Sequence, residues 1–227
     1  SDGYLESWFA FEPGVVLPKE NSIYYPGEAL LGIVRLHDLD PQPRYLETAV
    51  RAAAYLALKR WRWGGIELYV PPDAWLTQGI ADLYRKVKDP RLKAYCYELI
   101  DVTDMGMLRA EEGAAPDMDG GPGSGMTLPS VTPAGSRNEG MTAAYAMAIF
   151  AGDLEQAAHI RALSLRSTRF QLSQQLRPAN SWFLPNPGRA LGGFRSRADR
   201  LDVRIDYVQH NATGLVGVLH LLEEGPR

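Results

Sequence analysis

The sequence has a single cysteine, Cys96, among its 227 residues. One thiol excludes an intrachain disulfide framework and any cysteine-rich zinc site. Long apolar runs are missing as well, because none approaches the roughly 20 residues that a membrane-spanning helix needs. We therefore expect neither a membrane segment nor a fold that is held together by disulfides.

The sequence also lacks a large excess of either charge, since the formal net charge is −3 and basic and acidic residues are interspersed. This balance gives no overall positive field, so we expect no nucleic-acid partner. The patterns GxxxxGK[ST], HExxH and GxSxG do not occur, which argues against the nucleotide, zinc-protease and serine-hydrolase sites that they build. The sequence therefore predicts no cofactor and no bound metal.

Hydrophobic residues make up 45% of the chain and charged residues 22%, as is typical of a globular protein with a sizeable core. We predict one domain over residues 1–227, a length that a single core can support. The chain starts with Ser1-Asp2 and not with methionine. This start suggests a processed protein or a piece of a larger chain.

Two segments resemble each other at an offset of 47 residues, 27–58 and 74–102. In both, apolar residues recur at spacings of three and four around a short turn, as on one face of a helix. Pro43 and Pro90 follow that turn, where a first-turn proline is tolerated because its missing N–H has no intrahelical partner. Each segment therefore predicts a helical hairpin.

A third hairpin is predicted over 138–176, with Gly152-Asp153 as its turn, and a further inner helix over 206–222. The fold class that we predict is an all-α helical-hairpin array. Segments rich in Gly, Pro and aromatic residues precede the hairpins, and we call them the lead-in segments: 2–26, 61–72, 116–137 and 181–204. The first helices of antiparallel hairpins run the same way, so these loops or short strands should gather at one functional end.

Four motifs open the inner helices, and each contains a carboxylate: Glu28, Asp73, Glu139 and Asp206. Helix N-termini carry free N–H groups and partial positive charge, which favour anionic ligands and tune nearby carboxylates. The alternative is helix capping, which we expect for Asp73 and for Asn138. Glu28 and Asp206 have apolar or aromatic neighbours and are the preferred candidates for a ligand cleft.

His210 lies four residues after Asp206, on the same face of the predicted helix. A carboxylate that orients an imidazole is a recurrent arrangement for general acid–base catalysis near neutral pH. The alternative is a buried, hydrogen-bonded histidine with a structural role. The predicted catalytic set is Glu28, Asp206, His210, Asp73 and Glu139.

Arginines are frequent in the last lead-in segment, where they can clamp a carboxylate or phosphate. The alternative is a solvated loop held by salt bridges, in which Arg204 pairs with Asp206. Aromatic side chains of the lead-in segments can stack on sugar rings or pack loops onto helix ends. The predicted binding residues are Tyr24, Tyr25, Trp75, Arg137, Phe194, Arg195, Arg204 and Gln209, and further loop aromatics are Trp8, Phe9, Phe11, Trp61 and Trp63.

The motifs YYPGEALLGIVRLHD, PRYLETA, GGFRS and RIDYVQH, with a D-x-W helix start, resemble the α/α-toroid superfamily of six-hairpin, glycosidase-like domains. The resemblance implies a funnel of inner helices with a carbohydrate site at their N-terminal end, as in hydrolases, uronate lyases and sugar 2-epimerases. It also implies that Asp, Glu and His at those helix ends act as acids and bases. Because fewer than six hairpins are visible, we expect an incomplete or reduced toroid, with a partner domain or subunit completing it.

The predicted function is the binding of a uronate-bearing saccharide. Another small anionic ligand is the alternative. If the domain is an enzyme, it transforms this ligand by acid–base chemistry, as a glycoside hydrolase, lyase or epimerase. The alternative is a non-enzymatic helical-repeat module whose concave face binds a peptide or a protein partner. The two differ in where the polar groups point: into one shared pocket, or separately to solvent and backbone.

Overall fold

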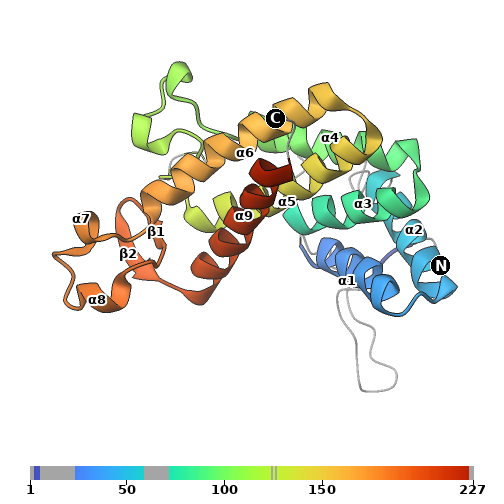
Figure 1. The fold of residues 1–227 in the computed structure, drawn as a ribbon, viewed down its shortest axis with the longest axis horizontal. Helices are drawn as coiled ribbons and strands as arrows, with labels where there is room; N and C mark the ends of the chain where they lie inside the picture. Colours follow the sequence, from blue (N-terminus) through green and yellow to red (C-terminus); the bar gives the residue numbers. More distant parts are fainter. Residues whose placement is uncertain (1–2, 6–23, 59–71, 124, 126, 225–227) are drawn as a thin grey trace. The chain divides into compact units, whose positions relative to one another are not determined.

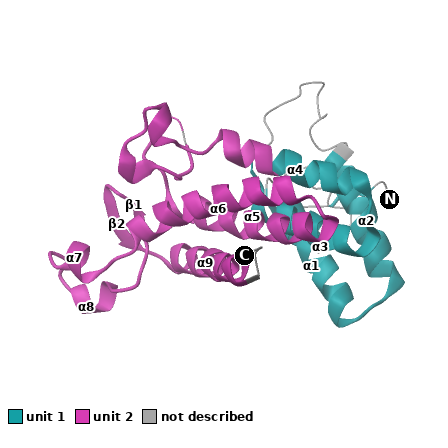
Figure 2. Ribbon diagram, turned by 45° about the horizontal axis from the view of Figure 1, so that its top comes forward, with its two compact units in different colours: residues 1–99 teal, residues 100–227 magenta. Residues whose placement is uncertain are grey.

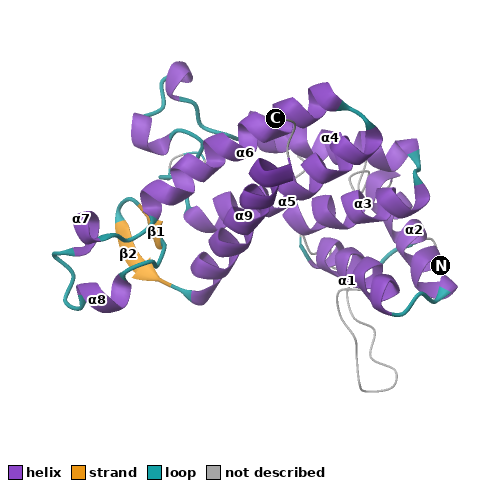
Figure 3. Cartoon of the chain, in the orientation of Figure 1, coloured by secondary structure: helices purple, strands orange, loops and turns teal. Residues whose placement is uncertain are grey.

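The structure is a computed structural model that describes residues 3–5, 24–58, 72–123, 125 and 127–224. Helices dominate these residues, and the sheet found among them has two strands (Figure 1, Figure 3). The predicted all-α class is therefore confirmed. Within these ranges, no helix has both the length and the apolar character that crossing a membrane requires.

The chain divides into two compact units, residues 1–99 (unit 1) and 100–227 (unit 2), coloured separately in Figure 2. Unit 1 contains the two hairpins that the repeat predicts, although the end of the last helix extends into unit 2. The helices are α1 (Tyr25–Leu39), α2 (Pro43–Leu58), α3 (Ala74–Val87) and α4 (Pro90–Met105). A single domain over the whole chain stays a prediction.

In unit 1, α1 and α3 run in the same direction, as expected for the first helices of successive hairpins. Near their N-terminal ends, a β-carbon added to Gly27 would lie 2.6 Å from the backbone nitrogen of Leu76. At their C-terminal ends, Lys86 of α3 forms an ion pair with Asp38 of α1. The core of the unit includes side chains with no more than 1% exposure: Leu30, Val34, Ala53, Leu56, Leu76, Ile80, Leu83 and Cys96.

Unit 2 contains the third hairpin and the further inner helix, separated by short helices and a strand pair. Its elements are two 3₁₀ turns, η2 (Ala110–Glu112) and η3 (Pro116–Met118), then α5 (Val131–Ala151), α6 (Leu154–Gln174), α7 (Pro178–Ser181), α8 (Pro187–Ala190), β1 (Arg195–Arg197), β2 (Arg200–Val203) and α9 (Ile205–Glu224). The strands are antiparallel, with Arg195 opposite Val203. The predicted Gly152-Asp153 turn between α5 and α6 is confirmed, and Gly152 supplies its left-handed conformation with φ of 77°.

One predicted boundary is wrong, because α5 starts at Val131 and not near Asn138. Val131 is fully buried, and Pro133 lies in the first turn, where its missing N–H costs nothing. Asn138 is therefore inside the helix and does not cap it. Its Nδ2 donates instead to Oγ1 of Thr168 in α6, at 3.0 Å.

Charge pairs tie the segment between α4 and α5 to α6. Nε of Arg166 donates to both carboxylate oxygens of Asp119, at 2.9 and 3.0 Å, and its Nη2 donates to Glu111. Burial raises the pKa of Asp119, but hydrogen bonds from Arg166 and the Ala110 N–H, with the charges of Arg166 and Arg169, bring it below its usual value. The hydrogen bond from Arg166 also lowers the pKa of Glu111. These contacts fix the first part of the third lead-in segment.

Candidate functional site

The candidate site lies in unit 2, where α5 crosses α9. Gly135 of α5 lies against the backbone of His210 and Asn211, and further along the same helices Thr142 lies against Gly217. The two helices therefore run in parallel, as the hairpin pattern predicts. A β-carbon on Gly135 would lie 2.8 Å from both the nitrogen of Asn211 and the carbonyl carbon of His210. A side chain at this position would therefore force the helices apart.

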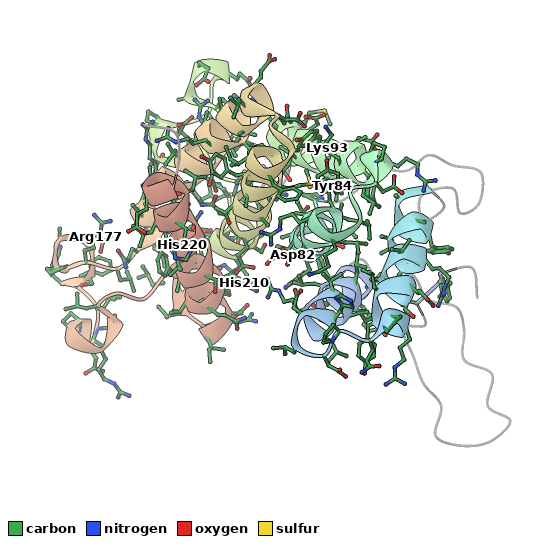
Figure 4. The ribbon with its side chains drawn as sticks, turned by 45° about the vertical axis from the view of Figure 1, so that its right-hand side comes forward. Asp82, Tyr84, Lys93, Arg177, His210 and His220 are labelled. Carbon is green, nitrogen blue, oxygen red and sulfur yellow. The ribbon has the colours of Figure 1, made fainter. Side chains whose placement is uncertain are left out.

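This close crossing brings Glu139 of α5 onto His210 of α9. Glu139 follows Gly135 by one turn on the same face of α5, and its Oε1 lies 3.1 Å from Nδ1 of His210. Both residues are buried, with 8% of Glu139 and 9% of His210 exposed; His210 is labelled in Figure 4. The carboxylate can thus orient the imidazole and hold a proton on Nδ1.

The N-terminal ends of α5 and α9 meet at the same end of unit 2. Val131, the first residue of α5, packs with Tyr207 of the first turn of α9 and with Phe194, which precedes β1. Nδ2 of Asn211 donates to the carbonyl oxygens of Val131, at 3.2 Å, and Tyr207, at 2.6 Å. Two lead-in segments therefore converge here. Phe194 is only 3% exposed, so it belongs to the core and is not an open platform for a sugar ring.

Asp206 is not the carboxylate that contacts His210, and this prediction is corrected. Nε and Nη2 of Arg204 donate to its two carboxylate oxygens, at 3.0 and 3.1 Å. The charge of Asp206 raises the pKa of the Arg204 guanidinium. Asp206 and His210 share a helix face, but this does not bring them into contact. Instead, the carboxylate of Asp206 accepts two hydrogen bonds from Arg204, two residues earlier, near solvent. The alternative role of Arg204, as a structural partner of Asp206, is confirmed.

A buried polar stripe on α6 was missed by the sequence reasoning. Asn138 of α5 accepts a hydrogen bond from Ser164 and donates to Thr168, and Nε2 of Gln171 donates to Oγ of Ser167 at 3.3 Å. The stripe has helical spacing, which is the signal that could have revealed it, and each member is at most 2% exposed: Ser164, Ser167, Gln171 and Gln174. The hydrogen bonds of Asn138 with Ser164 and Thr168 hold α5 and α6 in one register.

The predicted site residues of unit 1 lie at the N-terminal ends of α1 and α3. Asp73 caps α3, since its carboxylate accepts the Leu76 N–H at 3.0 Å, and the capping expectation is confirmed. Tyr24 and Trp75 are in edge-to-face contact, with ring centroids 5.5 Å apart and an interplanar angle of 73°. Glu28 is exposed in the first turn of α1. These groups form an aromatic and acidic helix end.

The remaining predicted residues are scattered or cannot be placed. Arg137 lines a cavity of about 10 Å³ in unit 2 together with Thr103 and Ser167. Gln209 is exposed on α9, and Tyr25 is 38% exposed on α1. Most of the first two lead-in segments lies outside the described residues, including Trp8, Phe9, Phe11, Trp61 and Trp63.

A larger open cavity of about 530 Å³ lies at the C-terminal end of α4. It is lined by Met105, Gly106, Met107, Leu108, Arg109, Glu112, Gly113, Ala114 and Gly123. Nη1 of Arg109 donates to the carbonyl oxygens of Asp104 and Met107, both at 3.1 Å. This arginine therefore donates hydrogen bonds at the C-terminal end of the helix, where backbone carbonyl groups have no partner within the helix.

In total, the structure brings together Glu139 with His210, Arg204 with Asp206, and Tyr24 with Trp75. A single site that combines residues of both units stays a prediction. Within the described ranges, no three His, Cys, Asp or Glu side chains are grouped so that they could hold a metal ion. No protein-family model, curated protein or solved structure matches the chain.

Proposed function

We propose that the chain is a carbohydrate-active domain in which Glu139 and His210 form the acid–base pair. The observation that carries the proposal is their contact of 3.1 Å between two parallel inner helices, in a buried setting. A buried carboxylate that contacts an imidazole is an arrangement that general acid–base sites use. Glu139 does not open its helix as predicted, because it lies more than two turns into α5. The saccharide assignment itself rests on the sequence motifs.

The pair can act through the nitrogen of His210 that does not face Glu139. With Nδ1–H directed at the carboxylate, a neutral imidazole has its lone pair on Nε2, which can take a proton from a substrate hydroxyl or carbon acid. Glu139 then compensates the positive charge that forms on the ring. In this scheme Glu139 is a positioning residue, and His210 is the catalytic base.

The other predicted residues take supporting roles in the proposal. Tyr24 and Trp75 form a candidate ring platform of their own within unit 1, because Tyr24 is 51% exposed while its ring is held by Trp75. Glu28 is the candidate acid at that end of unit 1, and Asp206 takes no acid–base role because its carboxylate pairs with Arg204. The parallel pair within each unit, α1–α3 in unit 1 and α5–α9 in unit 2, supports the proposal of an incomplete α/α toroid that a partner domain or subunit completes.

A panel of mono- and disaccharides that includes uronic acids tests the proposal, with turnover and binding measured on the full chain. We expect His210→Ala and Glu139→Gln to lower turnover by about 10²–10⁴-fold, the range for general acid–base groups. Asp206→Asn is the matched control, since this carboxylate lies one turn away and pairs with Arg204. Losses below tenfold in both His210→Ala and Glu139→Gln would reject the assignment.

A non-enzymatic helical-repeat module is the second candidate, and two local contacts favour it. Asp73 acts as a cap and Asp206 as an arginine partner, so two of the four predicted carboxylates already have structural roles. In this case no saccharide in the panel is turned over. Instead, variants of exposed apolar residues, such as Leu219→Ser, would weaken binding of a protein partner while Glu139→Gln would not.

A further inference from the structure

The arginines of the β1–β2 hairpin and the start of α9 differ in how their charge is compensated. Arg197 donates through Nε and Nη2 to the carboxylate of Asp199, at 3.1 and 3.2 Å. Arg204 is paired in the same way with Asp206. Each of these two arginines therefore has an aspartate two residues away as its counter-ion, and neither needs an external anion.

Arg195 has neutral partners instead. Its Nε donates to Oε1 of Gln174 at 3.0 Å, and its Nη1 reaches the carbonyl oxygen of Ala198 at 3.5 Å. The side chain is partly buried, and no carboxylate among the described residues forms an ion pair with it. A partly buried positive charge that has only neutral acceptors gains from a nearby anion, because amide oxygens do not cancel a full charge.

Gln174 holds the guanidinium in a fixed orientation. It lies at the end of α6 and is 2% exposed, and its Nε2 donates to Oγ of Ser173 at 2.8 Å, which leaves its Oε1 to accept from Arg195. Of the five N–H donors of a guanidinium, the two on Nη2 make no hydrogen bond among the described residues, and the long contact with Ala198 uses one of the two on Nη1, so a bidentate acceptor can still bind. That geometry matches a carboxylate.

The fold places Arg195 at the same end of unit 2 as the acid–base pair. Phe194, the residue before it, packs on Val131 and Tyr207, which begin α5 and α9. The N-terminal ends of these two long helices add partial positive charge to that of Arg195. Arg195 is therefore suited to an anionic ligand, whereas Arg197 and Arg204 already have aspartate counter-ions.

We propose that Arg195 recognises an oxyanion of the ligand, which in a saccharide is the carboxylate of a uronic acid. The preference for an anion follows from the charges and contacts in unit 2. Its assignment to a uronic acid rests on the proposed function. Arg195 is thus a specificity-determining residue, separate from the Glu139–His210 pair.

Titration of the full ¹⁵N-labelled chain with glucuronate, glucose and inorganic phosphate tests this inference by NMR. The wild type should bind glucuronate more tightly than glucose, and Arg195→Gln should weaken glucuronate binding about tenfold or more, as for a charge-assisted bidentate contact. Glucose binding should be unchanged. Arg195→Lys keeps the charge without the planar fork, so its affinity for glucuronate should be intermediate.

Arg204→Gln is the matched control, because it removes an arginine of the same region that already has a counter-ion. Equal glucuronate affinity in the wild type and Arg195→Gln, an equal loss in Arg204→Gln, or no binding of either anion to the wild type would overturn the inference. Arg195-dependent binding of phosphate and glucuronate alike, without any binding of glucose, would support the oxyanion site and count against the saccharide assignment. Thermal unfolding of each variant shows that it is folded.

Discussion

Gly135 of α5 faces the backbone of His210 in α9 so closely that a methyl group on it would lie 2.8 Å from the His210 carbonyl carbon. One turn later, Glu139 lies 3.1 Å from the His210 ring. The glycine and the glutamate share a face of α5, so the absence of a side chain at one position sets the contact at the other. The acid–base pair therefore depends on how closely the two helices approach.

We expect Gly135→Ala to lower the free energy of unfolding by about 1–3 kcal/mol, because the new methyl group meets backbone that cannot move independently. Chemical unfolding followed by circular dichroism measures this. The same variant should change the NMR signal of the His210 ring, since the contact with Glu139 is disturbed. Gly32→Ala is the matched control: its added carbon meets nothing within 4 Å, so it should stabilise the chain by about 0.5–1 kcal/mol. Equal effects of the two substitutions would contradict the role of Gly135.

Removal of the Asp73 carboxylate should destabilise unit 1. Asp73 is 1% exposed, and its carboxylate accepts the Leu76 N–H at the start of α3. Asp73→Ala leaves this donor without its partner, with an expected loss of about 0.5–2 kcal/mol in the free energy of unfolding. Asp73→Ser retains an acceptor at the cap and should lose less. A larger loss in the serine variant would show that the cap is not what the carboxylate contributes.

The charge pairs of Arg166 should make the free energy of unfolding depend on pH. The pKa of Asp119 and that of Glu111 are lowered in the folded chain, so both side chains bind protons more readily once the chain unfolds. Their contribution is therefore present above the ordinary pKa values, 3.8 for Asp119 and 4.5 for Glu111, and is lost as the pH falls toward the lower folded values.

Arg166→Gln removes these pairs, so its unfolding free energy should be below that of the wild type at pH 7 and approach it below about pH 4. Denaturant midpoints measured across this range test the prediction. Arg161→Gln, another arginine of α6 but without an ion pair among the described residues, is the control. A wild-type advantage that persists unchanged at low pH would show that the pairs do not act electrostatically.

Cys96 should report on the opening of unit 1. The side chain is fully buried, and burial raises the pKa of its thiol to about 12. The thiol therefore stays protonated and shielded at pH 8, and a disulfide reagent should label it only after unfolding in denaturant. Above the usual thiol pKa of 9.0, the unfolded chain loses this proton while the folded chain keeps it, so the free energy of unfolding should fall. Rapid labelling of the native chain at pH 8 would contradict its burial.

The helices could be predicted from the sequence because their signals are local. Pro43 and Pro90 mark the starts of α2 and α4, and Gly152 marks the end of α5. The start of α5 was missed because its first two turns contain Pro133, Gly135 and Ser136, residue types that are typical of loops. Buried contacts of Val131 override that local preference.

The partner of His210 could not be found in the same way. Asp206 is near it in sequence, whereas Glu139 is 71 residues away and meets it only through helix packing. Local spacing defines which residues share a helix face, but not which face of another helix lies opposite. The small residues Gly135 and Gly214 were the available signal, since closely packed helices need them at the crossing.

The burial of Asn211 determines whether residues 211–213 can be glycosylated. These residues match the acceptor sequence for N-linked glycosylation. Nδ2 of Asn211, the atom to which the sugar is attached, already donates to two backbone carbonyl groups and has no exposed surface. Attachment of a glycan and packing of α9 onto α5 therefore exclude one another. In a secretory expression host, folded molecules should carry no sugar at Asn211, and any glycosylated molecules should lack the Glu139–His210 contact.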